Sequence, residues 1–372
     1  MFWVAVFGLS FVMAAAGAIY LASRFYRFWL MGKLAKGKKV YRIAASVFTV
    51  LLLLLVTGKA LGPINAVVCL LHLAVFWLLC DFFFWLLALT GKGPSKYYYA
   101  GALAILVSVA YLGAGWVMAH HVWRTDYLVI TDKIEGDLRV VQVADAHIGT
   151  TFSGADFARY VEEIQALEPG LVLITGDFVD DSTSQADMVA ACEALGRLNT
   201  TYGVYFAFGN HDKGYYGPDI RGYDGNGLIG ELEKNRVQVL QDETLLIDGR
   251  FYLIGRKDFS EERGRQGARA SMNQLTQGLD PEKFSIVMDH QPCDYQAQEN
   301  AGVDLVLSGH THGGQLIPIG LINPLVSEND KVYGHEKRGD TNFIVSSGIS
   351  DWEVLFKTGC RSEYVVIEVK GK

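Results

Sequence analysis

Residues 301–315 read AGVDLVLSGHTHGGQ. The apolar run VDLVLS ends at Gly309, and two histidines, His310 and His312, follow two positions apart before two further glycines. A short apolar run that is bounded by turn residues is typical of a buried strand, and glycine permits a tight turn at its end. The stretch therefore predicts a strand that carries two imidazoles to one edge of a sheet, which is where α/β folds place their chemistry.

Four other stretches in the second half of the chain have the same design: LRVVQVAD, LVLITGD, GVYFAFGNHD and SIVMDH. Carboxylate, imidazole or carboxamide side chains stand at or just after their ends, namely Asp145, His147, Asp177, Asn210, His211, Asp212 and His290. A single motif of this kind is often only a turn. Five of the nine histidines fall in these motifs, however, and all five lie at predicted strand ends. Such a set of side chains is the ligand inventory of a two-metal hydrolase.

The segments between these strands predict an α/β fold. Helices are expected at about 154–168, 184–198 and 225–235. The later stretch VQVLQDETLLIDGRFYLIG reads as consecutive strands with a hairpin turn at Asp248-Gly249, and NFIVSSG and EYVVIEV read as the closing strands. Two packed sheets that are flanked by helices accommodate this order.

Charge is distributed unevenly along the 372 residues. Residues 1–122 contain ten Lys and Arg residues and one acidic residue, Asp81, whereas the remainder contains 23 basic and 39 acidic residues. The two parts predict two environments, a transmembrane domain at 1–123 and a globular domain at 124–372. The acidity of the second part argues against binding to a nucleic-acid backbone, which needs a basic surface.

Four segments of the first part are long and apolar enough to cross a bilayer, at about 2–23, 43–62, 64–90 and 99–122. The loop between the first two segments contains seven Lys and Arg residues, which is typical of a cytoplasmic loop. With four spans, the N-terminus and the globular domain both lie outside. The sequence therefore predicts a multi-pass protein of the cell membrane with an extracytoplasmic C-terminal domain.

Asp81 lies deep in the third predicted span. An intramembrane carboxylate is a functional candidate by default, but no second acidic residue is present in the spans to form a relay. We favour a hydrogen-bonded packing contact, with Ser46, Thr49 or Ser108 as partner. His72 is expected on the opposite face of the helix and is not an obvious partner.

Two charged stretches of the second part have alternative interpretations. One is basic and contains Arg256, Lys257, Arg263, Arg265 and Arg269. It either holds an anionic substrate near the site or is a solvated surface stretch, and the second interpretation is favoured. Asp180 and Asp181 are expected to be a solvated loop or a helix-capping pair, with extra metal contacts as the alternative.

The order of the motifs, DxH, GD, GNHD, H and GHTH, resembles the calcineurin-like metallophosphoesterase superfamily. The tail GHTHGGQ, together with Gly348 and the later TGCRSEY, resembles the membrane-tethered bacterial YkuE/YaeI-like branch. The resemblance covers about residues 137–370 and implies a four-layer α/β/β/α sandwich. Protein Ser/Thr phosphatases of this superfamily have an arginine after the GD motif. Here Gly176-Asp177 is followed by FVDD, which argues against a phosphoprotein substrate.

The resemblance also implies the roles of the motif residues. Two divalent metal ions would be bridged by Asp177, with Asp145, His147 and His312 at one ion and Asn210, His290 and His310 at the other. His211 would face the substrate phosphate and the leaving group, and Asp212 would orient it. Mixed nitrogen and oxygen ligands suit Mn, Fe or Zn better than Mg or Ca.

The predicted function is a membrane-anchored, dinuclear, metal-dependent phosphohydrolase. A metal-bridging hydroxide would attack a phosphomonoester or phosphodiester, and a lipid-linked phosphate is one candidate substrate. The alternative is a non-catalytic metal-binding membrane sensor or scaffold, which the complete set of motif residues disfavours. A transporter that uses Asp81 is a third and weaker alternative. The sequence specifies neither the substrate nor the oligomeric state.

Overall fold

The structure of the protein is a computed structural model that describes residues 2–90, 97–263, 269–318, 320, 322 and 327–372. The chain divides into two compact units, Met1–Gly115 and Trp116–Lys372. Each unit has its own apolar core.

The first unit is helical. Its helices are α1 (Phe2–Phe25), α2 (Trp29–Leu34), α3 (Lys39–Leu61), α4 (Pro63–Leu89) and α5 (Tyr99–His120), the last of which continues into the second unit. Among the described residues, α3, α4 and α5 are long and apolar enough to cross a membrane, and Phe11–Phe25 is a shorter apolar helix. The count of four spans therefore stays a prediction. The short helix α2 was not predicted.

Asp81 of α4 is held by side chains that the sequence did not indicate. Its carboxylate accepts hydrogen bonds from the hydroxyls of Tyr98 (2.7 Å) and Tyr20 (3.1 Å), and the Arg24 Nε lies 2.9 Å from it. The predicted partners are wrong, because their hydroxyls donate to carbonyls one turn earlier in their own helices; these residues are Ser46, Thr49 and Ser108. The interpretation of Asp81 as a packing contact agrees with this half-buried polar cluster.

The second unit contains, within the described residues, two mixed sheets of six strands each. The first sheet has the order β1 (Val122–Thr131), β12 (Ser362–Gly371), β2 (Asp137–Val143), β3 (Leu171–Thr175), β4 (Val204–Ala207) and β5 (Val237–Leu240). The second has the order β10 (Gly334–Arg338), β11 (Thr341–Val345), β9 (Leu305–Ser308), β8 (Phe284–Met288), β7 (Phe251–Gly255) and β6 (Glu243–Ile247). The predicted α/β fold with two sheets is confirmed.

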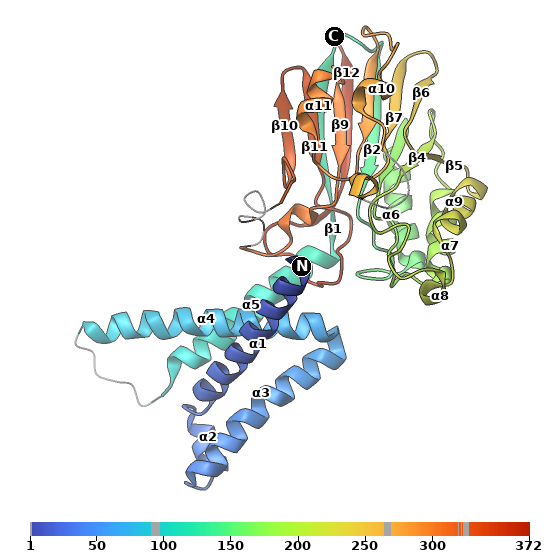
Figure 1. Ribbon diagram of the computed structural model, residues 1–372. Coiled ribbons are helices and arrows are strands. Elements are labelled where there is room, and N and C mark those ends of the chain that lie inside the picture. The colour runs from blue at the N-terminus through green and yellow to red at the C-terminus, as the bar shows by residue number, and fades with distance from the viewer. Residues whose placement is uncertain (1, 91–96, 264–268, 319, 321, 323–326) are drawn as a thin grey trace. The chain divides into compact units, whose positions relative to one another are not determined.

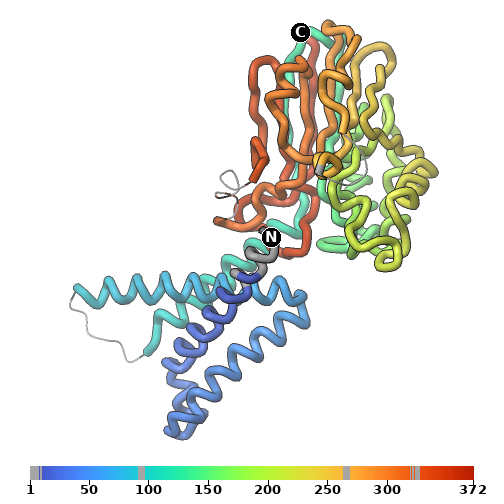
Figure 2. Tube along the Cα trace, viewed as in Figure 1, coloured from blue at the N-terminus to red at the C-terminus, as the bar shows by residue number. Residues whose placement is uncertain are grey.

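Strand direction brings the motif residues together. Strands β2, β3, β4 and β5 are parallel, as are β7, β8 and β9. The carboxyl ends of parallel strands meet at one edge of a sheet, so residues that follow them are neighbours. Strand β12, from the end of the chain, lies between β1 and β2 (Figures 1 and 2).

Alternating side chains of the strands supply three apolar cores. In β2, Val140 faces the core that contains residues of both sheets, and Val141 faces the core beneath the helices α6 (Gly154–Gln165), α7 (Gln185–Leu195) and α9 (Gly225–Lys234). A third core joins the second sheet to α10 (Met272–Leu275) and α11 (Tyr295–Asn300). This two-residue period is what a strand that is covered on both faces requires.

The ends of the helices follow local chemistry. Ser153 and Asp156 form a capping box at the start of α6, and the Ser184 side chain caps α7, so that backbone N–H groups without helical partners are satisfied. The hairpin predicted at Asp248-Gly249 is confirmed, because β6 and β7 pair in antiparallel fashion around it. Strand β1 and the short helix α8 (Pro218–Arg221) were not predicted.

The close approach of β5 and β7 generates a prediction. A Cβ on Gly255 would lie 2.2 Å from the Leu240 Cβ, so Gly255→Ala should destabilise the second unit by about 1–3 kcal/mol through overpacking. The matched control is Gly230→Ala in α9, where a Cβ meets nothing within 4 Å and alanine favours the helix. The measurement is urea unfolding of the full-length protein in detergent. Equal midpoints for the two variants would contradict the tight contact.

Candidate metal centre

The predicted ligands form two groups in space. Asp145, His147 and His312 form one, and Asp177, His290 and His310 form the other. Within each group, one possible ligand atom from every residue lies within 4.8 Å of the others. The residues follow β2, β3, β8 and β9, so that each group combines loops from both sheets.

The loops that carry these residues have an unusual backbone. Five of the six residues have a φ in the left-handed region: Asp145 (52°), His147 (36°), Asp177 (51°), His310 (71°) and His312 (48°). A non-glycine residue in this region is strained by about 1–3 kcal/mol and persists only where its surroundings fix it. Strain of this kind clusters at functional sites. Here the five strained residues all belong to the candidate metal centre.

Glycines precede three of the motif residues because the site leaves no room for a Cβ. A Cβ on Gly209 would lie 2.2 Å from the Asp177 Oδ1, and one on Gly309 would lie 2.3 Å from the Asp145 Oδ2. A Cβ on Gly176 would meet the His290 Nδ1 at 2.6 Å. Each glycine therefore makes space for a site residue from another strand.

The two carboxylates also connect the loops. Asp145 accepts a hydrogen bond from the backbone N–H of His310 (2.9 Å), which joins β2 of the first sheet to β9 of the second. Asp177 accepts one from the backbone N–H of His211 (2.9 Å). The Asp177 Oδ2 lies 3.1 Å from the His290 Nε2 and 3.7 Å from the His147 Nε2, so this carboxylate reaches a residue of each group.

Two imidazoles are each held through their Nδ1. The His147 Nδ1 lies 3.1 Å from an Asp180 carboxylate oxygen, and the His290 Nδ1 lies 2.8 Å from the Thr175 carbonyl oxygen. A ring that donates from one nitrogen presents the other nitrogen as a ligand. The Nε2 atoms of both rings therefore face the site as electron-pair donors.

Several buried atoms of the site have no hydrogen-bond partner in the part of the chain that the structure describes, namely the His147 Nε2, the His290 Nε2, the His310 Nδ1 and the Asn210 Oδ1. A buried polar group without a partner is costly, and four of them at one place indicate a missing ligand. All four can donate an electron pair to a cation. The donor set therefore fits divalent metal ions.

Burial and neighbouring carboxylates act on the ionisation of the site in opposite directions. Burial acts to lower the pKa of His147 and of His290, but Asp180 and Asp177 raise the pKa of the first and Asp177 raises that of the second. Burial raises the pKa of Asp145 to about 6 and lowers the pKa of His310 to about 4. It also lowers the pKa of His312 well below its usual range. Burial opposes ionisation of Asp180 too, but the hydrogen bond from His147 lowers the pKa of this carboxyl to about 2. Neutral imidazoles are the form that binds metals.

The Asp212 carboxylate is surrounded by backbone N–H groups. Its carboxylate accepts hydrogen bonds from four backbone N–H groups, those of Gly209 (2.7 Å), Phe178 (2.8 Å), Asp177 (2.9 Å) and Val179 (3.1 Å). These contacts hold the GD and GNHD loops together. The expectation that Asp212 orients the His211 ring stays a prediction, and these contacts show in addition that Asp212 fixes the loop that carries His211.

The His211 ring lies among other rings. Its centroid is 5.0 Å from that of Trp352, 5.1 Å from that of Tyr215 and 5.2 Å from that of His147. Burial lowers the pKa of His211. The ring is only partly covered, so it can meet a molecule that approaches from solvent.

The two acidic residues after Asp177 have separate functions. Asp180 is buried, and the prediction of a solvated residue is wrong for it, because its carboxylate is the hydrogen-bond partner of His147. Asp181 lies in a loop, but its carboxylate accepts hydrogen bonds from the backbone N–H groups of Tyr215 and Tyr216, which precede α8 and belong to no helix; the expected helix cap is therefore wrong for these contacts.

The basic stretch is in part a buried structural element. Arg256 and Arg269 are buried, and both donate to the carboxylate of Asp289, the residue before His290. The predicted solvated surface is therefore wrong for these two arginines, whereas the half-buried Lys257 pairs with Asp242 at 3.6 Å. Arg265 and the side chain of Arg263 lie outside the described residues.

Two residues near His312 were missed by sequence reasoning. Asp351 is fully buried, and its Oδ1 lies 3.6 Å from the His312 Nδ1 and 3.3 Å from the Lys357 Nζ. Lys357 is also fully buried and donates to the carbonyls of Ser347 (2.6 Å) and Ser350 (3.1 Å). Neither residue follows an apolar strand, and no local pattern in the sequence indicates them.

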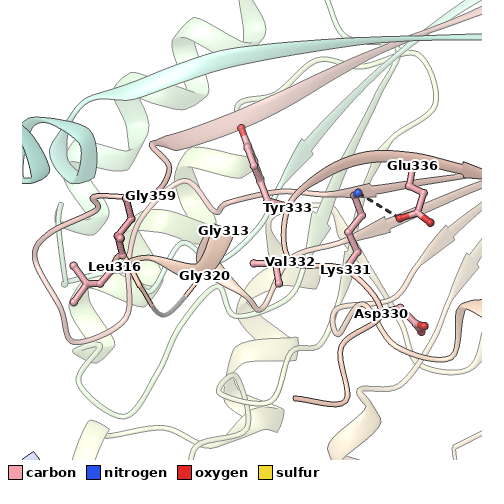
Figure 3. Close-up of a pocket in the computed structure, with 10 residues that line it drawn as sticks. Gly313, Leu316, Gly320, Asp330, Lys331, Val332, Tyr333, Glu336 and Gly359 are labelled. Atoms are coloured by element: carbon pink, nitrogen blue, oxygen red, sulfur yellow. Dashed lines mark hydrogen bonds and ion pairs between the residues drawn. The ribbon is translucent and has the colours of Figure 1, made fainter. Parts of the chain in front are cut away.

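A cavity of about 470 Å³ lies beyond Gly313 (Figure 3). Its wall includes Lys331 and Glu336, which form an ion pair at 3.4 Å, and the apolar side chain of Leu316. The lining contains none of the predicted ligands. This cavity is therefore separate from the candidate metal centre.

The contacts of Asp212 generate a prediction. Asp212→Asn places an amide against four N–H donors, and should lower the free energy of unfolding by about 3 kcal/mol or more and weaken metal binding. The matched control is Asp224→Asn at the exposed start of α9, where asparagine caps as well as aspartate. The measurements are unfolding and metal titration of the full-length protein. Loss of activity alone, with stability and metal affinity unchanged, would instead support the role of orienting His211.

Residues 138–314 match the family model described as Calcineurin-like phosphoesterase. An uncharacterized metallophosphoesterase of Campylobacter jejuni is 28% identical over 82% of this chain and 79% of its own length. The uncharacterized metallophosphoesterase YkuE of Bacillus subtilis is 28% identical over 73% of this chain and 93% of its own length. A transmembrane protein with metallophosphoesterase domain from Danio rerio is 31% identical over 63% of this chain, which spans about half (53%) of that relative. The resemblance drawn from the motifs is thus confirmed: this chain carries the calcineurin-like domain of a metal-dependent phosphoester hydrolase.

Proposed function

We propose that this protein is a membrane-anchored phosphohydrolase that uses two divalent metal ions. The observation that carries the proposal is the pair of Asp/His groups with electron-pair donors that lack partners. Asp145, His147 and His312 would hold one ion. Asn210, His290 and His310 would hold the other, and Asp177 would bridge the two.

The geometry supports this division of ligands. Asp177 reaches a histidine of each group, as a bridging carboxylate must. The Asn210 Oδ1 is buried without a hydrogen-bond partner, while its Nδ2 donates to the Tyr215 hydroxyl at 2.8 Å. The amide is thereby oriented with its oxygen free for a cation. The three apolar cores of the second unit support a four-layer α/β/β/α sandwich as the scaffold.

The donor set also suggests the metals. It mixes imidazole nitrogens with carboxylate and carboxamide oxygens, which suits Mn, Fe or Zn better than Mg or Ca. When bound, two such cations would neutralise the phosphoryl oxygens and activate a water as the nucleophile.

His211 would act as the proton donor to the departing oxygen of the ester. Its ring is partly covered and lies beside His147 of the first group. Its backbone is held by Asp177, and its loop is held by Asp212. Asp212 is therefore a positioning residue in this scheme, because it acts through the loop that carries His211.

We further propose that the apolar helices anchor the enzyme in a membrane. Three described helices have the required length and composition, and relatives from Danio rerio and Bos taurus are described as transmembrane proteins. The basic loop between α1 and α3 favours an extracytoplasmic C-terminal domain. Anchoring would confine the site to the neighbourhood of the bilayer, which favours a lipid-linked phosphomonoester or phosphodiester as substrate.

The catalytic proposal predicts metal-dependent turnover. Full-length protein in detergent with Mn²⁺ should hydrolyse p-nitrophenyl phosphate or bis-p-nitrophenyl phosphate, and Asp177→Asn and His211→Ala should each reduce kcat by about 100-fold or more. His335→Ala is the matched control, because His335 lies on β10 and contacts Asn342. If the protein binds metal but hydrolyses no ester, the result contradicts the hydrolase and supports the alternative function, a non-catalytic metal-binding sensor or scaffold.

The anchoring proposal predicts a preference among substrates. A phosphatidic-acid-type or lipid-linked phosphate in mixed micelles should be cleaved with a higher kcat/KM than a soluble ester with the same headgroup. The measurement is phosphate or headgroup release from the two substrates under identical metal conditions. Efficient cleavage of soluble nucleotides or diesters, with no cleavage of any lipid, would contradict the lipid-linked substrate.

A further inference from the structure

Two aromatic side chains frame His211 from loops that are far apart in the sequence. The Trp352 ring lies 5.0 Å from the imidazole between centroids, and the Tyr215 ring lies 5.1 Å from it. Tyr215 follows the GNHD motif, whereas Trp352 follows the buried Asp351. We call Tyr215 and Trp352 the aromatic frame.

The frame is held in place on the protein side. The Tyr215 hydroxyl accepts a hydrogen bond from the Asn210 amide at 2.8 Å, and its backbone N–H donates to the carboxylate of Asp181 at 3.0 Å. Trp352 directly follows Asp351, which the buried Lys357 pairs with at 3.3 Å. A ring whose backbone is fixed in this way presents a rigid surface and loses little conformational entropy when a ligand binds.

The same rings are exposed on the other side. The exposed fraction is 40% for Trp352 and 43% for Tyr215. A ring that served only the core would be buried, because the burial of aromatic surface is the favourable term. Large apolar rings that are fixed, exposed and adjacent to a polar site are typical of ligand-binding surfaces.

The position of the frame indicates which part of a substrate it meets. The predicted metal ligands would hold the phosphoryl group, and His211 would stand between that group and the frame. The two rings carry no positive charge and therefore do not attract the phosphoryl oxygens. The group that departs next to His211 is the part of the ester that would lie against the rings.

We propose that the aromatic frame binds an apolar leaving group of the phosphoester, so that this enzyme selects esters of apolar alcohols or phenols over those of small polar alcohols. This inference rests on the proposed function, because it assigns the leaving-group side from His211. Either a planar ring or an aliphatic group supplies the apolar surface, and the two sources are separated by experiment.

The test uses phosphonates that cannot be hydrolysed, so it does not depend on turnover. Phenylphosphonate, cyclohexylphosphonate and methylphosphonate are titrated into the full-length protein with Mn²⁺ by calorimetry. Trp352→Ala should weaken phenylphosphonate binding by about tenfold, in line with the loss of one ring stacking contact, and should leave methylphosphonate within twofold. Trp352→Phe should restore most of the phenylphosphonate affinity. Ile130→Ala is the control, because this exposed residue lies at the end of β1 that is remote from the site.

Each outcome has one meaning. A loss for phenylphosphonate alone supports a planar leaving group, and equal losses for the phenyl and cyclohexyl ligands support an aliphatic one. If Trp352→Ala weakens the binding of all three phosphonates equally, or of none of them, the aromatic frame does not bind the leaving group. Phosphonate binding with the predicted pattern but without turnover of any ester would overturn the proposed hydrolase and leave the frame intact.

Discussion

The hydrogen bond from the His310 backbone N–H to the Asp145 carboxylate is the interaction on which the rest of the site depends. It joins the loop after β2 in the first sheet to the loop after β9 in the second sheet, so each loop restricts the position of the other. The absence of a Cβ at Gly309 permits this approach, since a Cβ there would lie 2.3 Å from the Asp145 Oδ2. The apolar core between the sheets can then place the residues of each Asp/His group within a few ångströms of one another.

This arrangement is unfavourable for the protein without its ligand. Five residues of the site have left-handed backbones, and several of its buried donors of electron pairs lack partners among the described residues. Such features are retained where they serve a function and are offset elsewhere. Contacts around the site offset the free-energy cost of the strained backbone and of the unpartnered buried atoms. Asp212 accepts hydrogen bonds from four backbone N–H groups, and Lys357 donates to two carbonyls that precede Asp351. Bound cations would relieve the remaining cost.

Sequence reasoning could place the ligands because each stands at the end of an apolar strand, which is a local pattern. It could not place Asp180 or Asp351, because a buried acid beside a histidine depends on contacts between distant segments. The same limit explains the error at Arg256 and Arg269: their charges suggested a surface, but Asp289 pairs with both inside the fold. The partners of Asp81 were missed for the related reason that two tyrosines and an arginine converge on it from two segments, α1 and the residues just before α5.

We propose that the two Asp/His groups hold two metal ions per chain. The most direct test is the metal content of the purified full-length protein, measured by mass spectrometry after exchange into Mn²⁺. The account predicts two ions per chain in the unaltered protein, one in His290→Ala or in His147→Ala, and fewer than one in Asp177→Asn. A metal content that is below one in the unaltered protein, or the same in all four proteins, would contradict it.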